Sequence, residues 1–173
     1  MEIDLKRYLR DVPDFPKPGI LFKDITPLLG APEAFGAAVE RLAEAARRRG
    51  AEAVIGIESR GFIFGAPVAR ELGIPFVPVR KPGKLPAERM SIEYSLEYGA
   101  SQLDIHKDAL RPGQRAVIID DLLATGGTAE AAAVLTERIS GQVAGFLFVV
   151  ELTGLGGRGR LTSYPVESLV AFP

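Results

Sequence analysis

The segment that decides the fold reads Val117-Ile118-Ile119-Asp120-Asp121-Leu122-Leu123-Ala124-Thr125-Gly126-Gly127-Thr128. It begins with a continuous apolar run, which is typical of a strand buried on both faces of a parallel sheet. Two carboxylates follow, and then a loop of threonine and glycine that opens a predicted helix. Free N–H groups and the positive dipole end of a helix N-terminus attract anions, and glycines let a phosphate approach the main chain. The segment therefore predicts a phosphate-binding turn between a buried strand and a helix.

The chemistry around this turn favours a sugar phosphate. The loop lacks the lysine of a nucleoside-triphosphate P-loop, so a single phosphate fits it better. Asp120 and Asp121 would repel that phosphate unless they accept hydrogen bonds from sugar hydroxyls or border a metal ion. An ordinary capped turn explains any one of these features alone, whereas the whole string predicts a ribose 5-phosphate site. Its phosphate-binding residues are Ala124, Thr125, Gly126, Gly127 and Thr128.

Further apolar runs and amphipathic patterns alternate on both sides of this segment. Short runs rich in Val, Ile and Phe predict strands at 53–57, 75–79, 116–119, 143–150 and 168–172. Apolar residues at spacings of three and four predict helices at 32–49, 61–72 and 127–139. This alternation predicts an α/β fold with a mostly parallel twisted sheet, helices on both faces and a ligand crevice at the carboxyl ends of the strands.

Composition excludes several other classes of protein. The chain has 173 residues, 47% hydrophobic and 25% charged, which fits one globular domain. The chain has no Cys and one His, which excludes Cys/His zinc sites and cysteine nucleophiles. Any metal must therefore bind to oxygen atoms. A net charge of -1 argues against a nucleic-acid partner. There is no N-terminal apolar segment, and the longest apolar run, 146–150, is too short to span a bilayer, so we expect a soluble cytoplasmic protein with no membrane partner.

Residues 81–103 interrupt the alternation of strands and helices. A turn-like stretch, Lys81-Pro82-Gly83-Lys84-Leu85-Pro86, is followed by apolar and polar residues that alternate from 91 to 98. An insertion of this length inside a compact domain is usually disordered or functional, and the strand-like alternation favours function. We therefore predict a flap that closes over the crevice and excludes water.

The string at 117–128 resembles the phosphoribosyl-diphosphate (PRPP) signature of type I phosphoribosyltransferases. Segments at 13–25, 58–62, 80–86, 95–99 and 150–153 resemble, in order, the adenine-specific members of that family, so the resemblance covers nearly the whole chain. It implies one domain over 1–173, with an N-terminal hood at about 1–30 and a flexible flap at about 81–103. It also implies transfer of ribose 5-phosphate from PRPP to N9 of adenine, giving AMP and diphosphate in purine salvage, with Mg²⁺ on substrate oxygens and a homodimer.

The resemblance also implies site residues outside the phosphate loop. Cations after the first two strands suit the leaving diphosphate, although Arg60 alone would also suit the start of a surface helix. The turn at 58–60 often has a cis peptide between its first two residues in this family. The implied diphosphate-binding residues are Glu58, Ser59, Arg60, Arg80, Lys81 and Lys84.

For the base, the resemblance implies that Phe22 stacks on adenine, with Leu21 and Lys23 beside it and Leu152 opposite. A flat ring alone does not distinguish adenine from guanine. Relatives often carry Arg where this chain has Lys23, which leaves the role of Lys23 open. On the flap, the resemblance implies that Glu97 is catalytic, with Tyr98 beside it. Residues 93–94 repeat the same dipeptide, and Gly99 is the reason for choosing the second copy.

Three other interpretations can be weighed on the sequence. Residues 154–159 form a literal G-x-G-x-x-G, but only 14 residues follow, too few for a dinucleotide-binding unit, so a mobile loop near the base pocket is expected. A phosphoribosyltransferase for another base, such as xanthine, guanine or hypoxanthine, or orotate, remains an alternative. So does a non-catalytic PRPP-sensing regulator, which the near-neutral charge and the lack of a helix-turn-helix segment disfavour.

Overall fold

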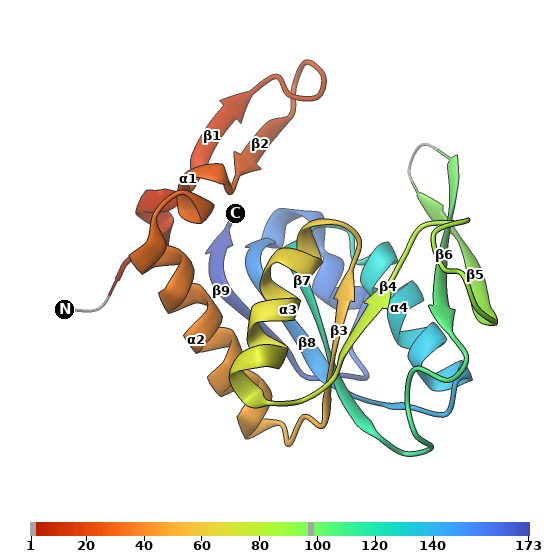
Figure 1. Ribbon diagram of the computed structural model, residues 1–173. Helices are drawn as coiled ribbons and strands as arrows, with labels where there is room; N and C mark the ends of the chain where they lie inside the picture. The colour runs from red at the N-terminus through yellow and green to blue at the C-terminus, as the bar shows by residue number, and fades with distance from the viewer. Residues whose placement is uncertain (1–2, 97–98) are drawn as a thin grey trace.

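The computed structural model describes residues 3–96 and 99–173, and a five-stranded sheet forms its centre (Figure 1). The strand order is β4-β3-β7-β8-β9, and every neighbouring pair is parallel. This confirms the predicted parallel α/β sheet. The strands are β3 (Ala53–Ile57), β4 (Phe76–Val79), β7 (Arg115–Leu123), β8 (Gln142–Leu152) and β9 (Val166–Phe172).

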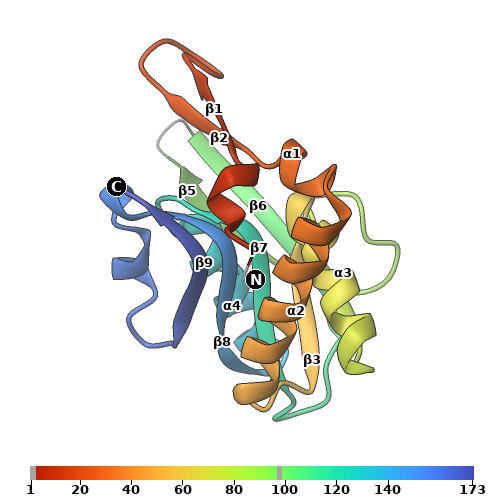
Figure 2. The ribbon, with the colours of Figure 1, turned by 90° about the vertical axis from the view of Figure 1, so that its left-hand side faces the viewer.

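Helices cover both faces of the sheet, as predicted (Figures 1 and 2). Alternate side chains of a strand point to opposite faces. Val117 and Ile119 of β7 accordingly pack with α2 (Pro32–Arg48) and α3 (Arg60–Leu72). Ile118, between them, packs on the other side with α4 (Gly127–Arg138). The continuous apolar run at 116–119 therefore reflects burial on both faces.

The prediction that the strand ends at residue 119 was wrong. β7 continues through Asp120 and Asp121 to Leu123, and its last residues still pair with β8, Leu122 with Val150 and Leu123 with Glu151. The carboxylates thus lie within the strand, where the neighbouring strand holds their main chain. This pairing places the phosphate loop directly at the carboxyl end of the sheet.

The hood projects above the carboxyl ends of the sheet (Figure 1). It consists of η1 (Leu5–Tyr8), the antiparallel strands β1 (Arg10–Pro13) and β2 (Leu21–Asp24), and α1 (Thr26–Leu29). Leu5 and Leu28 are buried in the cluster that α2 and α3 share with the sheet. The hood is therefore anchored in the main core although its hairpin extends beyond it.

The segment predicted as a flap forms a second antiparallel pair, β5 (Arg89–Leu96) and β6 (Gly99–His106), here called the flap hairpin. The second strand extends beyond the predicted end at 103, because Leu103 and Ile105 are fully buried in the core cluster that contains α4. Its base is joined to the residue after β4 by paired main-chain hydrogen bonds between Arg80 and Asp104 (2.9 and 2.8 Å).

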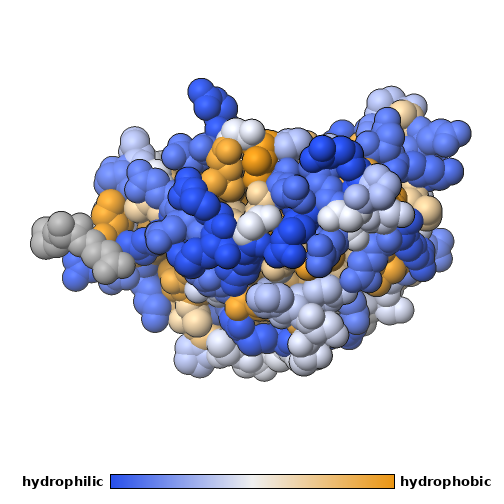
Figure 3. All heavy atoms as spheres, turned by 90° about the horizontal axis from the view of Figure 1, so that it is seen from below, coloured by the Kyte–Doolittle hydropathy of each residue, from blue (hydrophilic) through white to orange (hydrophobic). Residues whose placement is uncertain are grey.

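The hood and the flap hairpin both stand at the carboxyl ends of the strands, on the side where the crevice was predicted. The opposite side, seen from below in Figure 3, is mostly hydrophilic with small scattered apolar areas. Within the described residues, no helix combines the length and the apolar character needed to cross a bilayer.

Candidate active site

The phosphate loop, residues 124–127, connects β7 to α4 and lines a cavity of about 200 Å³. Gly126 is the N-cap of α4 and has a left-handed backbone (φ 84°), which glycine adopts without steric cost. The N–H groups of the first helical turn have no partner within their own helix, so they are available to an anion. The cavity brings together all seven residues predicted for the sugar phosphate: Asp120, Asp121, Ala124, Thr125, Gly126, Gly127 and Thr128.

The two aspartates form an interacting pair at the floor of this cavity. The main-chain N–H of Asp121 donates to Oδ1 of Asp120 (2.9 Å). Burial, and then the charge of Asp121, raise the pKa of Asp120 well above its ordinary value. Burial also raises the pKa of Asp121, although the charge of Arg60 opposes that change. In this environment the ionised pair needs hydroxyl donors or a cation to stabilise it.

Arg60 supplies one such cation. Its Nε lies 2.9 Å from Oδ2 of Asp121, and its guanidinium carbon lies 5.6 Å from the centre of the Phe22 ring. The side chain is 44% exposed, so it is free to exchange partners at modest cost. Arg60 therefore links the first turn of α3, the aspartate pair and the hood.

A second cavity, of about 440 Å³, adjoins the first and takes in part of the predicted diphosphate site. Glu58, Ser59, Arg60 and Lys81 line it. The Glu58–Ser59 peptide is cis, as the resemblance implied. Asp120, Asp121 and Thr128 line both cavities, so a ligand that spans the two would meet the aspartates midway.

Arg80 and Lys84 have a different place from Lys81. Arg80 donates from Nε to Oε2 of Glu58 (3.1 Å) and from Nη1 to the main-chain oxygen of Lys84 (3.2 Å). The N–H of Lys81 also donates to Glu58 (3.0 Å). Burial raises the pKa of Glu58, but these hydrogen bonds and the nearby charges outweigh it and leave the pKa below its ordinary value. Arg80 and Glu58 thus hold the loop after β4 against the loop after β3.

The predicted adenine residues divide between two surfaces. Leu21, Lys23 and Leu152 line a cavity of about 1000 Å³ between the hood and the ends of β8 and β9. Phe22 points elsewhere, with its ring 5.1 Å from that of Phe15 and beneath Arg60. Alternation along β2 explains this division.

The side chain of Lys23 has a clear structural contact set. Its Nζ donates to Oδ1 of Asp11 (2.6 Å) and lies 4.0 Å from the centre of the Phe172 ring. The side chain is only 9% exposed. Lys23 therefore ties the hood hairpin to β9 through an ion pair and a cation–π contact.

The catalytic residues implied for the flap, Glu97 and Tyr98, lie outside the described residues. The described part of the flap hairpin adds Tyr94 to the site. In the sequence, Tyr94 stands out only as part of the dipeptide at 93–94 that repeats residues 97–98. Its hydroxyl lies 3.2 Å from Oγ1 of Thr128, and it lines the second cavity. Alternation along the strand was the signal that could have identified it, because Tyr94 shares a face with Ile92, and both pack partly buried against the core cluster that contains α4.

Comparison with known proteins agrees with this geometry. The family model for the phosphoribosyl transferase domain matches residues 29–167. An adenine phosphoribosyltransferase of Synechococcus sp. is 56% identical over 170 residues, covering 98% of this chain and 99% of the relative. One of Chloroflexus aurantiacus is 57% identical over 169 residues, covering 98% of both.

Solved structures give the same result. The crystal structure of adenine phosphoribosyltransferase from Thermoanaerobacter pseudethanolicus superposes with a TM-score of 0.94 at 55% identity, covering 97% of this chain and 98% of that one. The enzyme of Saccharomyces cerevisiae, solved with an imino-altritol bisphosphate and adenine, has a TM-score of 0.90 at 41% identity, covering 95% and 96%. This chain therefore belongs to the adenine phosphoribosyltransferase family of phosphoribosyl transferase domain proteins.

Proposed function

We propose that this chain is a pentosyltransferase of purine salvage that transfers ribose 5-phosphate from PRPP to N9 of adenine, giving AMP and diphosphate. The observation that carries the proposal is the continuity of the three cavities. Thr125 lines both the phosphate cavity and the large cavity under the hood, while Thr128 lines both the phosphate cavity and the cavity at Glu58. One sugar phosphate at the loop would thus have a base on one side and a diphosphate on the other.

The charges of the described residues suit the parts of PRPP. The 5′-phosphate fits the N-terminus of α4, where the hydroxyls of Thr125 and Thr128 add donors. The ribose hydroxyls fit Asp120 and Asp121, which need donors. The diphosphate fits the cavity at Glu58 and Ser59, where Arg60 and Lys81 supply positive charge. When diphosphate binds, Arg60 would exchange Asp121 for the ligand.

The reaction breaks the bond between C1′ and the diphosphate oxygen and forms one between C1′ and N9 of adenine. Positive charge develops on the ribose ring as the diphosphate leaves, so the nearby aspartates stabilise the transition state electrostatically. Arg60 and Lys81, which line the cavity at Glu58, would hold the departing anion, and Lys84 would add positive charge near Glu58. Leu21, Lys23 and Leu152 line the cavity proposed for the base, whereas Phe22 would stack on adenine there only if its ring turned from Arg60 toward that cavity. A closed flap would keep water from the activated sugar.

We infer that Mg²⁺ takes part while bound mainly to substrate oxygens. Within the described residues, no three His, Asp or Glu side chains gather closely enough to hold a metal ion. We expect Asp120 and Asp121 to lie beside this Mg²⁺. Both carboxyl groups are buried, so a nearby cation would stabilise their negative charges. When bound, Mg²⁺ would neutralise charge on the leaving diphosphate.

Chelation separates a substrate-borne metal from a structural one. EDTA is expected to abolish AMP formation, and excess Mg²⁺ to restore it, while the thermal unfolding midpoint of the ligand-free protein stays unchanged. The measurement is AMP formation beside a thermal melt, each with and without EDTA. A lower unfolding midpoint in EDTA would show that the folded protein itself holds a metal and would contradict the inference.

Glu97 is proposed to act on the reacting centre, with Tyr98 beside it. Glu97→Gln is expected to lower kcat at least tenfold and leave PRPP affinity near that of the wild type, because an interaction made in the transition state affects kcat. Glu93→Gln is the matched control, since it makes the same change in the repeated dipeptide and should leave kcat within twofold. If steady-state kinetics gave the same kcat for both variants, Glu97 would not have this role.

The overall function is tested by offering the purified protein PRPP with each candidate base. We expect AMP from adenine, and little or no nucleotide from guanine, hypoxanthine, xanthine or orotate. Product from another base in preference to adenine would identify a transferase of different specificity. PRPP binding without turnover of any base would point to a regulator that senses PRPP.

We further infer a cytoplasmic homodimer whose partners are PRPP and adenine rather than nucleic acid or membrane. The family resemblance supports the dimer, and the net charge of -1 offers no general attraction for nucleic acid. Sedimentation of the purified protein over a range of concentrations measures the oligomeric state directly.

A further inference from the structure

The glycine-rich segment after β8, residues 154–160, has no role in the site described so far. It was expected to be a mobile loop near the base pocket. It does lie at that cavity, but the structure orders it as two short helices, η2 (Thr153–Leu155) and η3 (Gly157–Arg160). A Gly-rich sequence that is ordered without forming a dinucleotide site requires another explanation.

The first observation is a contact of main chain on main chain. A Cβ placed on Gly157 would overlap the main-chain oxygen of Ala124 and lie 3.0 Å from its carbonyl carbon. A Cβ placed on Gly126 would lie 2.5 Å from the main-chain oxygen of Gly157. The two segments therefore fit together only because both residues lack a side chain. Gly157 supports the phosphate loop at the point where Gly126 turns into α4.

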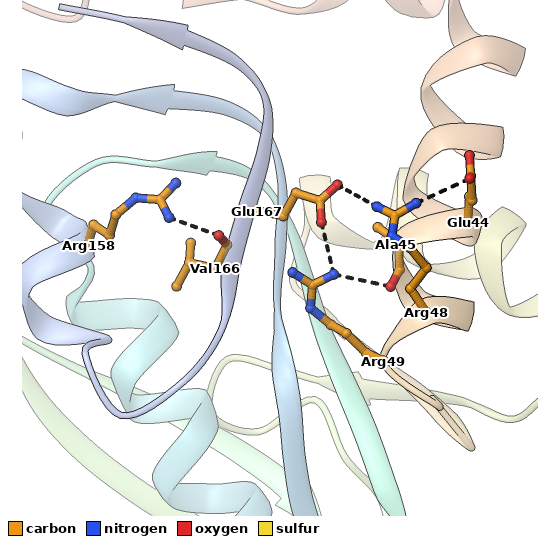
Figure 4. A network of polar contacts seen from close by, with 7 residues as sticks. All are labelled: Glu44, Ala45, Arg48, Arg49, Arg158, Val166 and Glu167. Carbon is orange, nitrogen blue, oxygen red and sulfur yellow. Dashed lines mark hydrogen bonds and ion pairs between the residues drawn. The ribbon is translucent and has the colours of Figure 1, made fainter.

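The second observation is that side-chain contacts tie this segment down. Arg158 donates through Nε to Oε1 of Glu151 (2.9 Å) and through Nη2 to Oε2 (2.5 Å), and Glu151 is only 5% exposed. Ser168 of β9 donates to the same carboxylate (2.7 Å). Arg158 also donates to the main-chain oxygen of Val166 (2.8 Å), as Figure 4 shows. This bidentate pair joins the segment to both β8 and β9.

The electrostatics favour a persistent pair. The hydrogen bonds from Arg158 lower the pKa of Glu151 despite its burial, and the bonds to Glu151 raise the pKa of Arg158. Both groups therefore stay charged at neutral pH. Two residues on, Arg160 reaches Oε2 of Glu130, in the first turn of α4 (3.2 Å). The helix that follows the phosphate loop is thus linked to the segment as well.

On its other side, the segment reaches the base subsite. Gly154 and Leu155 line the large cavity together with Leu21 and Leu152. A single residue, Gly156, therefore separates Leu155 in the wall of the base cavity from Gly157, which supports the phosphate loop. Both contacts depend on where the Glu151–Arg158 pair holds this segment.

We propose that residues 154–160 form a positioning segment, in which Gly157 fixes the main chain of the phosphate loop and the Glu151–Arg158 pair holds Gly157 in place. Gly157 meets the loop through the main chain of Ala124, and among the described residues neither Gly157 nor Arg158 lines the phosphate cavity, so both are positioning residues and not catalytic ones. This inference rests on the proposed assignment of residues 124–127 to the 5′-phosphate.

The test compares two alanine substitutions in the same segment. Gly157→Ala is expected to raise the KM for PRPP at least tenfold with kcat within threefold, because the lost interaction holds substrate and transition state alike. Gly159→Ala is the matched control, since a Cβ at that position meets no atom of the described residues within 4 Å. Its KM should stay within twofold. Calorimetry with ribose 5-phosphate should show a matching loss of affinity for Gly157→Ala alone.

The outcomes separate this inference from the proposed function. If the wild type makes no AMP and does not bind ribose 5-phosphate, the function has failed. If the wild type is active and Gly157→Ala has an unchanged KM for PRPP, the positioning role is overturned. Should Gly157→Ala fail to fold, Arg158→Lys and Arg158→Gln replace it. We expect the KM for PRPP to rise several-fold in the glutamine variant and less in the lysine variant, and unchanged values in both overturn the role.

Discussion

Asp120→Asn is expected to lower kcat/KM for PRPP about 100-fold while raising the thermal unfolding midpoint of the ligand-free protein. The activity falls because a charge-assisted hydrogen bond to a ribose hydroxyl is worth about 1.5–3 kcal/mol, and because the anion near C1′ is removed. Steady-state kinetics with PRPP varied at saturating adenine measures this part of the prediction.

The thermal unfolding midpoint rises because the substitution removes the buried charge that is proposed to bind the ribose hydroxyls. Burial and the charge of Asp121 raise the pKa of Asp120 above its ordinary value of 3.8, so the folded state binds a proton more tightly than the unfolded state. A group with a raised acid pKa contributes a stability that declines as pH rises from the unfolded pKa through the folded pKa. Above the unfolded pKa, ionising this buried carboxyl therefore costs the folded protein stability, and asparagine removes that cost. Melts from about pH 4 to 8 should show a weaker decline in the variant.

Asp108→Asn provides the control, because Asp108 is an exposed aspartate in the turn after β6 and the substitution changes net charge identically. It should alter neither kcat/KM nor the pH dependence of unfolding. An Asp120→Asn variant that is less stable than the wild type at neutral pH would show that Asp120 supports the fold. Retained activity would remove Asp120 from the ribose site.

The sequence predicted the elements that local pattern determines. The run at 116–119 indicated a strand buried on both faces, and the structure places its alternate side chains in two different core clusters. Threonine and glycine after this strand indicated a helix N-terminus, and α4 begins at Gly127 as predicted. These features depend on a few consecutive residues, so one sequence is enough to identify them.

Contacts between distant segments could not be predicted in this way. Nothing near Lys23 in the sequence indicates that it would contact the ring of Phe172, at the other end of the chain. Likewise, the need for glycine at 157 arises from the main chain of Ala124, more than 30 positions earlier. The spacing of the glycines at 154–159 matches a dinucleotide-binding motif. The packing against Ala124 instead explains why residue 157 in particular is glycine.

The flap shows where sequence pattern and structure complement each other. Alternation predicted a strand-like ribbon and covered Tyr94, but only the fold brings that hydroxyl to Thr128. The antiparallel register sets Tyr94 opposite Ser101, and both residues line the diphosphate cavity. The flap hairpin thus contacts the first turn of α4, directly after the phosphate loop.

Gly127→Val is expected to reduce PRPP affinity at least 100-fold without unfolding the protein. Gly127 is the first residue of α4 and lines the cavity of about 200 Å³ in which the 5′-phosphate is proposed to bind. A Cβ at this position would lie 3.7 Å from the main-chain oxygen of Ser95 and 3.9 Å from the Tyr94 ring, both ordinary contacts. The fold can therefore accept a Cβ at this position, whereas a phosphate close to the main chain leaves no room for a branched side chain. Calorimetry with PRPP measures the loss.

Two comparisons make this result specific to the phosphate loop. Gly36→Val makes the same substitution in α2, where a Cβ meets no atom of the described residues within 4 Å, and PRPP affinity should be unchanged. Gly126→Val, by contrast, should lose both affinity and stability, because Gly126 has a φ of 84° and lies against Gly157. If Gly127→Val bound PRPP as tightly as Gly36→Val, the 5′-phosphate would have to bind elsewhere. The assignment of the aspartates to the ribose would then fail too, because both depend on the same position of the sugar.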